Sequence, residues 1–131
     1  MEFTVSTSRR QELVDITKEI AEAVEKSGIK DGLCNVYVPH ATAAIAINEN
    51  ADPNISLDII EALDKMVKEG IWRHDKLDGN AASHIKAAIV GPSETIPIED
   101  GKLVLGTWQD IFLCSFDGPK DRRVRVTIVG K

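Results

Sequence analysis

The chain has 131 residues, 43% of them hydrophobic and 28% charged, which is the composition of an ordinary globular domain. Sixteen basic and 21 acidic residues give a net charge of −5, which argues against non-specific binding to nucleic acid or to an anionic membrane. No apolar run approaches the roughly 18 residues of a membrane span. The N-terminus also lacks the charged-then-apolar pattern of a signal peptide.

The length predicts a single domain over residues 1–131. Cys34 and Cys114 lie in strand-like segments without CxxC spacing, and they indicate small buried side chains in a reducing compartment. The pattern leaves a disulfide between them open but does not require one. We therefore expect the protein in the cytoplasm.

Residues 2–7 alternate between polar and apolar side chains and predict a short strand. Ser8 and Gln11 have the spacing of a capping box, which predicts that a helix begins there and ends at Gly28. The apolar face of this helix comprises Leu13, Ile16, Ile20 and Val24. The charged outer face of this helix is explained by contact with solvent and does not indicate a functional site.

The middle of the chain predicts two strands followed by two helices. The strands cover residues 32–38 and 43–48, and the helices run from Ser56 to Gly70 and over residues 81–90. Asn80 is a good N-cap for the second of these helices, and Gly91 ends it. The loop Arg73–Gly79 between the helices is the most polar segment of the chain.

The last third predicts strands joined by tight turns. These strands cover residues 95–98, 102–105, 109–116 and 123–129. Asp100-Gly101 and Asp117-Gly118 are strong hairpin signals, because Asp-Gly tolerates positive φ. Strands outnumber helices and are linked as hairpins. We therefore predict an α+β fold, a single compact domain with a mostly antiparallel β-sandwich-like core and about three helices.

All three histidines, His40, His74 and His84, lie in two short stretches rich in acidic and amide residues. Neutral imidazole is the commonest protein ligand for Zn²⁺, and three imidazoles with an open position are typical of a catalytic zinc site. The gaps of 34 and 10 residues do not match a helical metal motif, so the fold would have to assemble any shared site. The alternative is three histidines without a joint role.

The predicted helix start at Asn80 has two interpretations. If Asn80 caps the helix, the free N–H groups of Ala81, Ala82 and Ser83 face outward and can bind a phosphate-like anion beside His84. The alternative is an ordinary capped helix whose alanines pack closely on a sheet. The sequence does not decide between them.

Other polar features have an ordinary structural interpretation beside a functional one. Glu49 follows a strand end and Asp75 follows His74, so either can belong to a polar turn or move a proton. We expect Trp108 to lie in the core or at a subunit interface, and the alternative is that it lines a ligand pocket. The cluster Arg122–Arg125 is the one basic segment of the chain. We expect it to form a solvated strand face, and the alternative is a contact with an anion.

The segment from Ser93 to Ile111 resembles the signature of the YjbQ family. That signature runs Ser, two residues, aliphatic, one residue, aliphatic, two residues, Gly, four residues and Gly-Thr-Trp-Gln, and every fixed position is met. The blocks VPHATAAIAINENADP and WRHDKLDGNAASHIKAAIVGPSETIP are also similar to that family. A departure is Ala41, where many members have threonine.

The resemblance implies a compact α+β sandwich-like fold and a homotrimer. We expect exposed apolar strand residues such as Ile111 and Leu113 as candidate contacts between the chains. It also implies a polar pocket in which His40, His74 and His84 bind a divalent metal, most simply zinc, with Glu49, Asp75 and Asn80 nearby. The activity associated with the family joins a thiazole phosphate to a pyrimidine pyrophosphate and releases pyrophosphate, forming thiamine phosphate.

Three functions follow from these expectations. The first is a metal-assisted enzyme acting on a small phosphorylated metabolite, with Glu49 a better proton-transfer group than Asp75 because it ends a strand. The second is a module that binds a metal or phosphorylated ligand without turnover. The third is a structural subunit whose histidines line a trimer contact.

Overall fold

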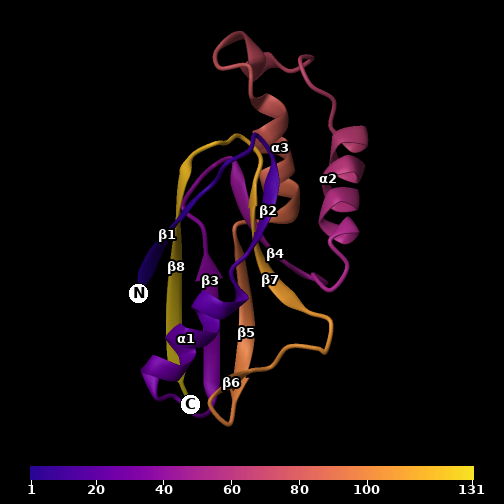
Figure 1. Ribbon diagram of the computed structural model, residues 1–131. Coiled ribbons are helices and arrows are strands. Elements are labelled where there is room, and N and C mark those ends of the chain that lie inside the picture. Colours follow the sequence, from indigo (N-terminus) through magenta and orange to yellow (C-terminus); the bar gives the residue numbers. More distant parts are fainter.

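Two antiparallel sheets enclose the main core in the computed structural model, which describes all 131 residues (Figure 1). The five-stranded sheet has the order β1 (Glu2–Ser6), β8 (Asp121–Gly130), β3 (Gly32–Tyr37), β5 (Ser93–Glu99) and β6 (Lys102–Leu103). The three-stranded sheet has the order β2 (Glu12–Asp15), β7 (Asp110–Ser115) and β4 (Ala43–Asn48). Alternation along each strand of the larger sheet directs apolar side chains toward the smaller one.

Three helices and one short 3₁₀ turn complete the domain. They are α1 (Thr17–Ser27), α2 (Asn54–Met66), η1 (Arg73–Lys76) and α3 (Ala81–Val90). Helix α1 contributes Ile20 and Val24 to the core between the sheets. Helices α2 and α3 cover the other face of the three-stranded sheet, where Leu63 and Ala87 pack with Phe112 of β7 (Figure 1).

The predicted α+β class and the mostly antiparallel core with three helices are confirmed. Helix α3 has the predicted bounds, and Gly28 ends α1 in the left-handed region with φ of 70°. The turn at Asp100-Gly101 is a hairpin in which both residues have positive φ. These features are encoded locally, within a few residues of where they form.

Two predictions about the flanking segments are wrong. The expected helix from Ser8 is instead strand β2 followed by α1, because Glu12–Asp15 pairs with β7. The Glu12 carboxylate accepts the Ser8 N–H at 2.6 Å, so the expected capping box does not form. Helix α2 begins at Asn54 and ends at Met66, before Gly70.

The turn at Asp117-Gly118 does not join a hairpin. Strand β7 pairs with β2 and β4, whereas β8 pairs with β1 and β3, so this turn carries the chain from one sheet to the other. A Cβ on Gly118 would lie 2.4 Å from the carbonyl oxygen of Arg9. Glycine is therefore required here by close packing, not by positive φ.

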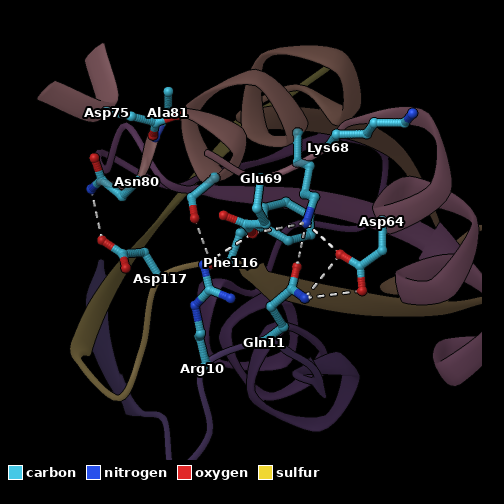
Figure 2. Close-up of polar contacts among 12 residues, drawn as sticks. Arg10, Gln11, Asp64, Lys68, Glu69, Asp75, Asn80, Ala81, Phe116 and Asp117 are labelled. Atoms are coloured by element: carbon cyan, nitrogen blue, oxygen red, sulfur yellow. Dashed lines mark hydrogen bonds and ion pairs between the residues drawn. The ribbon is translucent and has the colours of Figure 1, made fainter. Parts of the chain in front are cut away.

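A fully buried lysine ties the two outer helices to the segment that precedes β2. The ammonium of Lys86 on α3 donates to Asp64 of α2 and, at 2.9 Å, to the Gln11 amide oxygen. Arg10 pairs with Glu69 at 2.9 Å beside this contact (Figure 2). Burial raises the pKa of Asp64, but the hydrogen bonds from Lys86 and Gln11 and the Lys86 charge outweigh it, so the pKa is lowered.

Replacing Asp64 with Asn should lower the free energy of unfolding by about 2–3 kcal/mol, because buried Lys86 loses its nearest counter-charge while Asp64 itself is half-exposed. A lowered pKa means that this stabilisation is complete above about pH 4 and is lost as pH falls through the folded-state value. The variant should therefore lose less stability than the wild type on acidification. Urea titrations at neutral and acidic pH measure both effects.

Asp58→Asn is the matched control, because Asp58 lies exposed on the same helix. It should stay within about 0.5 kcal/mol of the wild type. Equal losses in the two variants would contradict the role assigned to Lys86.

Candidate functional site

The imidazole rings of His74 and His84 are in contact, with centroids 4.8 Å apart and ring planes at 79°. His74 belongs to η1, and His84 lies one turn into α3. The polar loop folds back so that η1 packs against the start of α3. The fold thus brings together two of the three predicted histidines, although ten residues separate them in the sequence.

His40 lies beside His84 across a small open hollow of about 170 Å³ that both side chains line. Small residues such as Ala43 and Ala87 also line it. The Nε2 atom of His40 accepts the backbone N–H of Arg123 at 3.0 Å, so the neutral ring carries its proton on Nδ1. The three histidines therefore form a row, His40–His84–His74, which we call the histidine row. Within this single chain, no three His, Cys, Asp or Glu side chains have metal-holding geometry.

The surroundings of His40 favour the neutral form of its ring. Partial burial lowers its pKa, and the positive charges of Arg122, Arg123 and Lys120 lower it further. A neutral imidazole is the form that binds a metal ion. The acceptor nitrogen of His40 is already used by the Arg123 N–H, however, so within one chain the ring offers the Nδ1–H donor and not a metal ligand.

Two buried polar atoms near the histidine row have no hydrogen-bond partner, namely Nε2 of His74 and Oδ1 of Asn80. Nε2 of His74 lies 3.4 Å from a carboxylate oxygen of Asp78, but no hydrogen bond forms. The Asn80 amide donates to Asp117 at 2.8 Å, and because a carboxylate only accepts, this contact fixes the amide orientation (Figure 2). Unpartnered buried atoms cost about 1–3 kcal/mol each. An imidazole nitrogen and an amide oxygen can each give an electron pair to a divalent metal ion as a ligand.

Asp75 forms a structural bridge. Its Oδ2 accepts the N–H of Trp72 at 3.0 Å. Its Oδ1 accepts the N–H of Ala81, also at 3.0 Å (Figure 2). These two backbone groups, first Trp72 and then Ala81, lower the pKa of Asp75. One N–H precedes His74 and the other precedes His84, so the carboxylate sets the distance between the two rings. Both oxygens are occupied, which does not suit the proton-transfer role predicted for Asp75.

The start of α3 is not the open cradle that one sequence interpretation predicted. Asn80 occupies the N-cap position, but its side chain makes no capping hydrogen bond. The N–H of Ala81 is taken by Asp75, and that of Ser83 donates to the Asn80 carbonyl at 3.1 Å. Ala81, Ala82 and Ser83 are buried, and the Ser83 hydroxyl donates to the Phe116 carbonyl. The structure agrees instead with the alternative interpretation, in which the alanines at the start of this helix are closely packed.

Glu49 lies away from the histidine row within one chain. His40 precedes β4 and Glu49 follows it, and this six-residue strand extends over about 17 Å between its first and last Cα atoms. The neighbours of Glu49 are instead Asn48, whose side chain accepts the Glu49 N–H, and Asn50, which donates to Asp15. Proximity in the sequence was misleading because the intervening residues are extended.

Arg122 is the residue of this region that sequence analysis missed. Its side chain is only 1% exposed, and it donates to Ser115 at 3.1 Å and to the Thr42 hydroxyl at 2.9 Å. Burial lowers the pKa of Arg122, while Asp117 raises it. The solvated face expected for the basic cluster is correct for Arg123 and Arg125, which are exposed. The missed signal was alternation, because Arg122 has the phase of the buried residues of β8.

Trp108 is 64% exposed, so its assignment to the core of a single chain is wrong. The Gln109 side chain accepts the Gly106 N–H at 2.7 Å and shapes this loop. An interface role for Trp108 stays a prediction.

The fold and the site together define an α+β sandwich protein with a polar, histidine-lined site at one end. The chain belongs to the UPF0047 family, because the family model described as UPF0047 protein YjbQ-like matches residues 1–131. The UPF0047 protein MJ1081 of Methanocaldococcus jannaschii is 49% identical over 98% of this chain and 92% of its own length. The UPF0047 protein YugU of Bacillus subtilis is 40% identical over 96% of both chains.

Solved structures of similar proteins have the same fold. A YjbQ/UPF0047 family protein from Clostridium acetobutylicum superposes with a TM-score of 0.95 at 47% identity, covering 98% of this chain and 99% of that one. A YbjQ-like protein from Sulfolobus solfataricus gives 0.97 at 42% identity, with coverages of 100% and 96%. The names of these relatives state a family and no activity. None of the helices here is both long and apolar enough to cross a membrane.

Replacing Asp75 with Asn should loosen the link between η1 and α3, because a neutral amide accepts hydrogen bonds more weakly than a carboxylate. The Ala81 amide should exchange with solvent faster in the variant, as measured by hydrogen exchange detected by NMR. Because the pKa of Asp75 is lowered, the difference should be full above about pH 4 and disappear at lower pH. Asp78→Asn, in the same loop, should leave this exchange unchanged. Unaltered Ala81 exchange in Asp75→Asn would contradict the bridge.

Proposed function

We propose that the histidine row binds a divalent metal, most simply zinc, and that the protein is a metal-assisted enzyme acting on a small phosphorylated metabolite. The observation that carries the proposal is the contact of His74 with His84 beside two unpartnered buried atoms, Nε2 of His74 and Oδ1 of Asn80. Imidazole nitrogen is a ligand that zinc prefers, and an amide oxygen is a ligand that harder divalent cations accept. When bound, such an ion supplies a Lewis acid for a phosphoryl oxygen.

The chain's own residues would orient this site. The Arg123 N–H anchors the ring of His40 through Nε2, which leaves the Nδ1–H to donate to an anionic ligand. Asp75 holds His74 and His84 at a fixed separation through the backbone on either side. Restraint of this kind matters because small misplacements of reacting groups cost large factors in rate. We therefore propose Asp75 as a positioning residue and do not propose it as a base.

A transferase reaction is the first activity to test. The family resemblance supports thiamine-phosphate formation, in which a thiazole phosphate displaces pyrophosphate from a pyrimidine pyrophosphate. The assay should detect thiamine phosphate and pyrophosphate in equal amounts. Chelator-sensitive product formation would support the enzyme.

A binding module without turnover is the second candidate. One observation favours it: the two carboxylates expected to move protons are placed elsewhere, Asp75 in the bridge and Glu49 beyond the far end of β4. The two candidates differ in one measurement, because a binding module takes up metal and ligand but forms no product.

We also propose that the protein assembles as a homotrimer in the cytoplasm. Ile111 and Leu113, the strand residues first considered as contacts, are fully buried in the core and cannot serve. The outer face of the five-stranded sheet is a better candidate, because Leu33 and Val129 are neighbours in register there and at least half-exposed. The free, buried thiols of Cys34 and Cys114 fit a reducing compartment.

The metal proposal predicts that purified protein retains close to one equivalent of zinc per chain, measured by elemental analysis after dialysis. His74→Ala and His84→Ala should lower the affinity about 10²-fold or more, because each removes a ligand. Glu49→Gln, beyond the far end of β4, should retain the metal and serves as the control. Zinc retained equally by all variants would exclude the histidine row as the site.

The oligomer proposal predicts a particle of three times the 14.3 kDa chain mass by light scattering. Adding a charge at the apolar outer face, as in the double variant Leu33→Lys and Val129→Lys, should shift the mass to one chain without altering the circular dichroism. A wild-type protein with the mass of a single chain at micromolar concentration would contradict the trimer.

A further inference from the structure

Arg122 carries a buried positive charge that the described hydrogen bonds leave uncompensated. Its guanidinium donates to the Ser115 hydroxyl and to the hydroxyl and carbonyl of Thr42, all neutral acceptors. It forms no ion pair within 4.0 Å, since all seven pairs of the structure involve other residues. Lys86, the other fully buried cation, contacts Asp64 directly. A buried charge is costly unless an opposite charge offsets it.

Asp117 is the carboxylate whose charge acts on Arg122, and it is already shared. One of its oxygens accepts both the Asn80 amide at 2.8 Å and the Lys120 ammonium at 2.9 Å. Asp121 is held by the Ser6 hydroxyl on the exposed side of the strand. The remaining charges near His40 are positive: Arg122, Arg123 and Lys120 all act on its ring. This basic region is local, because the whole chain has a net charge of −5.

The position of Arg122 links this charge to the histidine row. Thr42 lies two residues after His40, and Arg122 holds both its hydroxyl and its carbonyl. The next residue, Arg123, holds the ring of His40 through its backbone N–H. Two consecutive residues of β8 therefore fix the loop that carries His40, one of them with a buried charge.

We propose that Arg122 makes the histidine site selective for an oxyanion of the phosphate type, which binds beside His40 and completes the charge balance of the buried guanidinium. The inference rests on the proposed function in that it concerns the same site, but it requires no metal. Arg122 is too buried to touch the ligand, so it is a positioning residue that acts through its field and through Thr42. We expect the anion to contact Lys120, whose side chain is half-exposed and pairs with Asp117 at 2.9 Å.

The test uses the full chain after its metal has been removed with a chelator. Inorganic phosphate and pyrophosphate are titrated by calorimetry, and the backbone amides of Ala41 and Arg123 are followed by NMR. We expect saturable binding that weakens with added salt and shifts both amides. Arg122→Gln should weaken phosphate binding about tenfold, while Arg122→Lys, which keeps the charge, should remain within about threefold of the wild type.

Arg125→Gln is the matched control, because it removes the same charge from the exposed face of the same strand. It should change the affinity less than about twofold. A loss equal to that of Arg122→Gln would reduce the effect to net charge and overturn the proposal. An equal loss in Arg122→Lys would assign Arg122 a purely structural role and would also overturn it.

If Arg122→Gln does not fold, Lys120→Gln gives the decisive comparison, since Lys120 lies on the surface. Weaker phosphate binding in Lys120→Gln supports the oxyanion site, and unchanged binding overturns it. Absence of phosphate binding by the metal-free wild type overturns this inference while leaving zinc retention by the histidines intact. Phosphate binding without any zinc retention would support this inference and contradict the metal proposal. The two proposals can therefore fail separately.

Discussion

Strand β7 is buried on both faces, and this constraint determines where the rest of the molecule can lie. Ile111 and Leu113 face the core between the two sheets, while Phe112 and Cys114 face the helices. A strand with both faces buried needs a continuous run of apolar residues in its sequence, and it lies in the middle of its sheet. Its neighbours β2 and β4 then become the edges, and α2 with α3 must cover its second face (Figure 1).

The end of β7 is also where the buried polar groups collect. Ser115 accepts from Arg122, and the Phe116 carbonyl accepts from Ser83. Asp117 accepts from Asn80 (Figure 2). The chain leaves the hydrophobic layer here, so its polar groups need partners, which come from the start of α3 and the start of β8. These bonds hold the start of α3 and the start of β8 against one another. This convergence brings His84 of α3 beside His40, whose ring is held by the Arg123 N–H of β8.

How far the sequence predicts this molecule depends on the range of each interaction. Helix α3 and the Asp100-Gly101 hairpin were predicted correctly because glycine and Asp-Gly signals act within a few residues. Strand β2 was mistaken for the first turns of a helix because its pairing with β7 is non-local. The sheet-to-sheet turn at Asp117 was mistaken for a hairpin because local signals do not reveal which strands pair.

The candidate site follows the same rule. The grouping of polar residues correctly pointed to His74 and His84, which meet in space. The bridge made by Asp75 was not predictable, because its second acceptor contact is to Ala81, six residues away across an irregular loop. Arg122 was predictable in principle, since strand alternation gives it the phase of buried valines, but a charged residue biased the interpretation toward solvent.

The two ends of the histidine row differ in electrostatic character. At the His74 end lie two unpartnered buried polar atoms, Nε2 of the ring and Oδ1 of Asn80, whose amide nitrogen donates to Asp117. At the His40 end lie the positive charges of Arg122 and Lys120. Asp117 is the one carboxylate that acts on Arg122. One end thus suits a cation and the other an anion, with His84 between them. A metal ion and a phosphoryl group are complementary to such an arrangement together, because each offsets a charge or lone pair that the fold itself leaves unpaired.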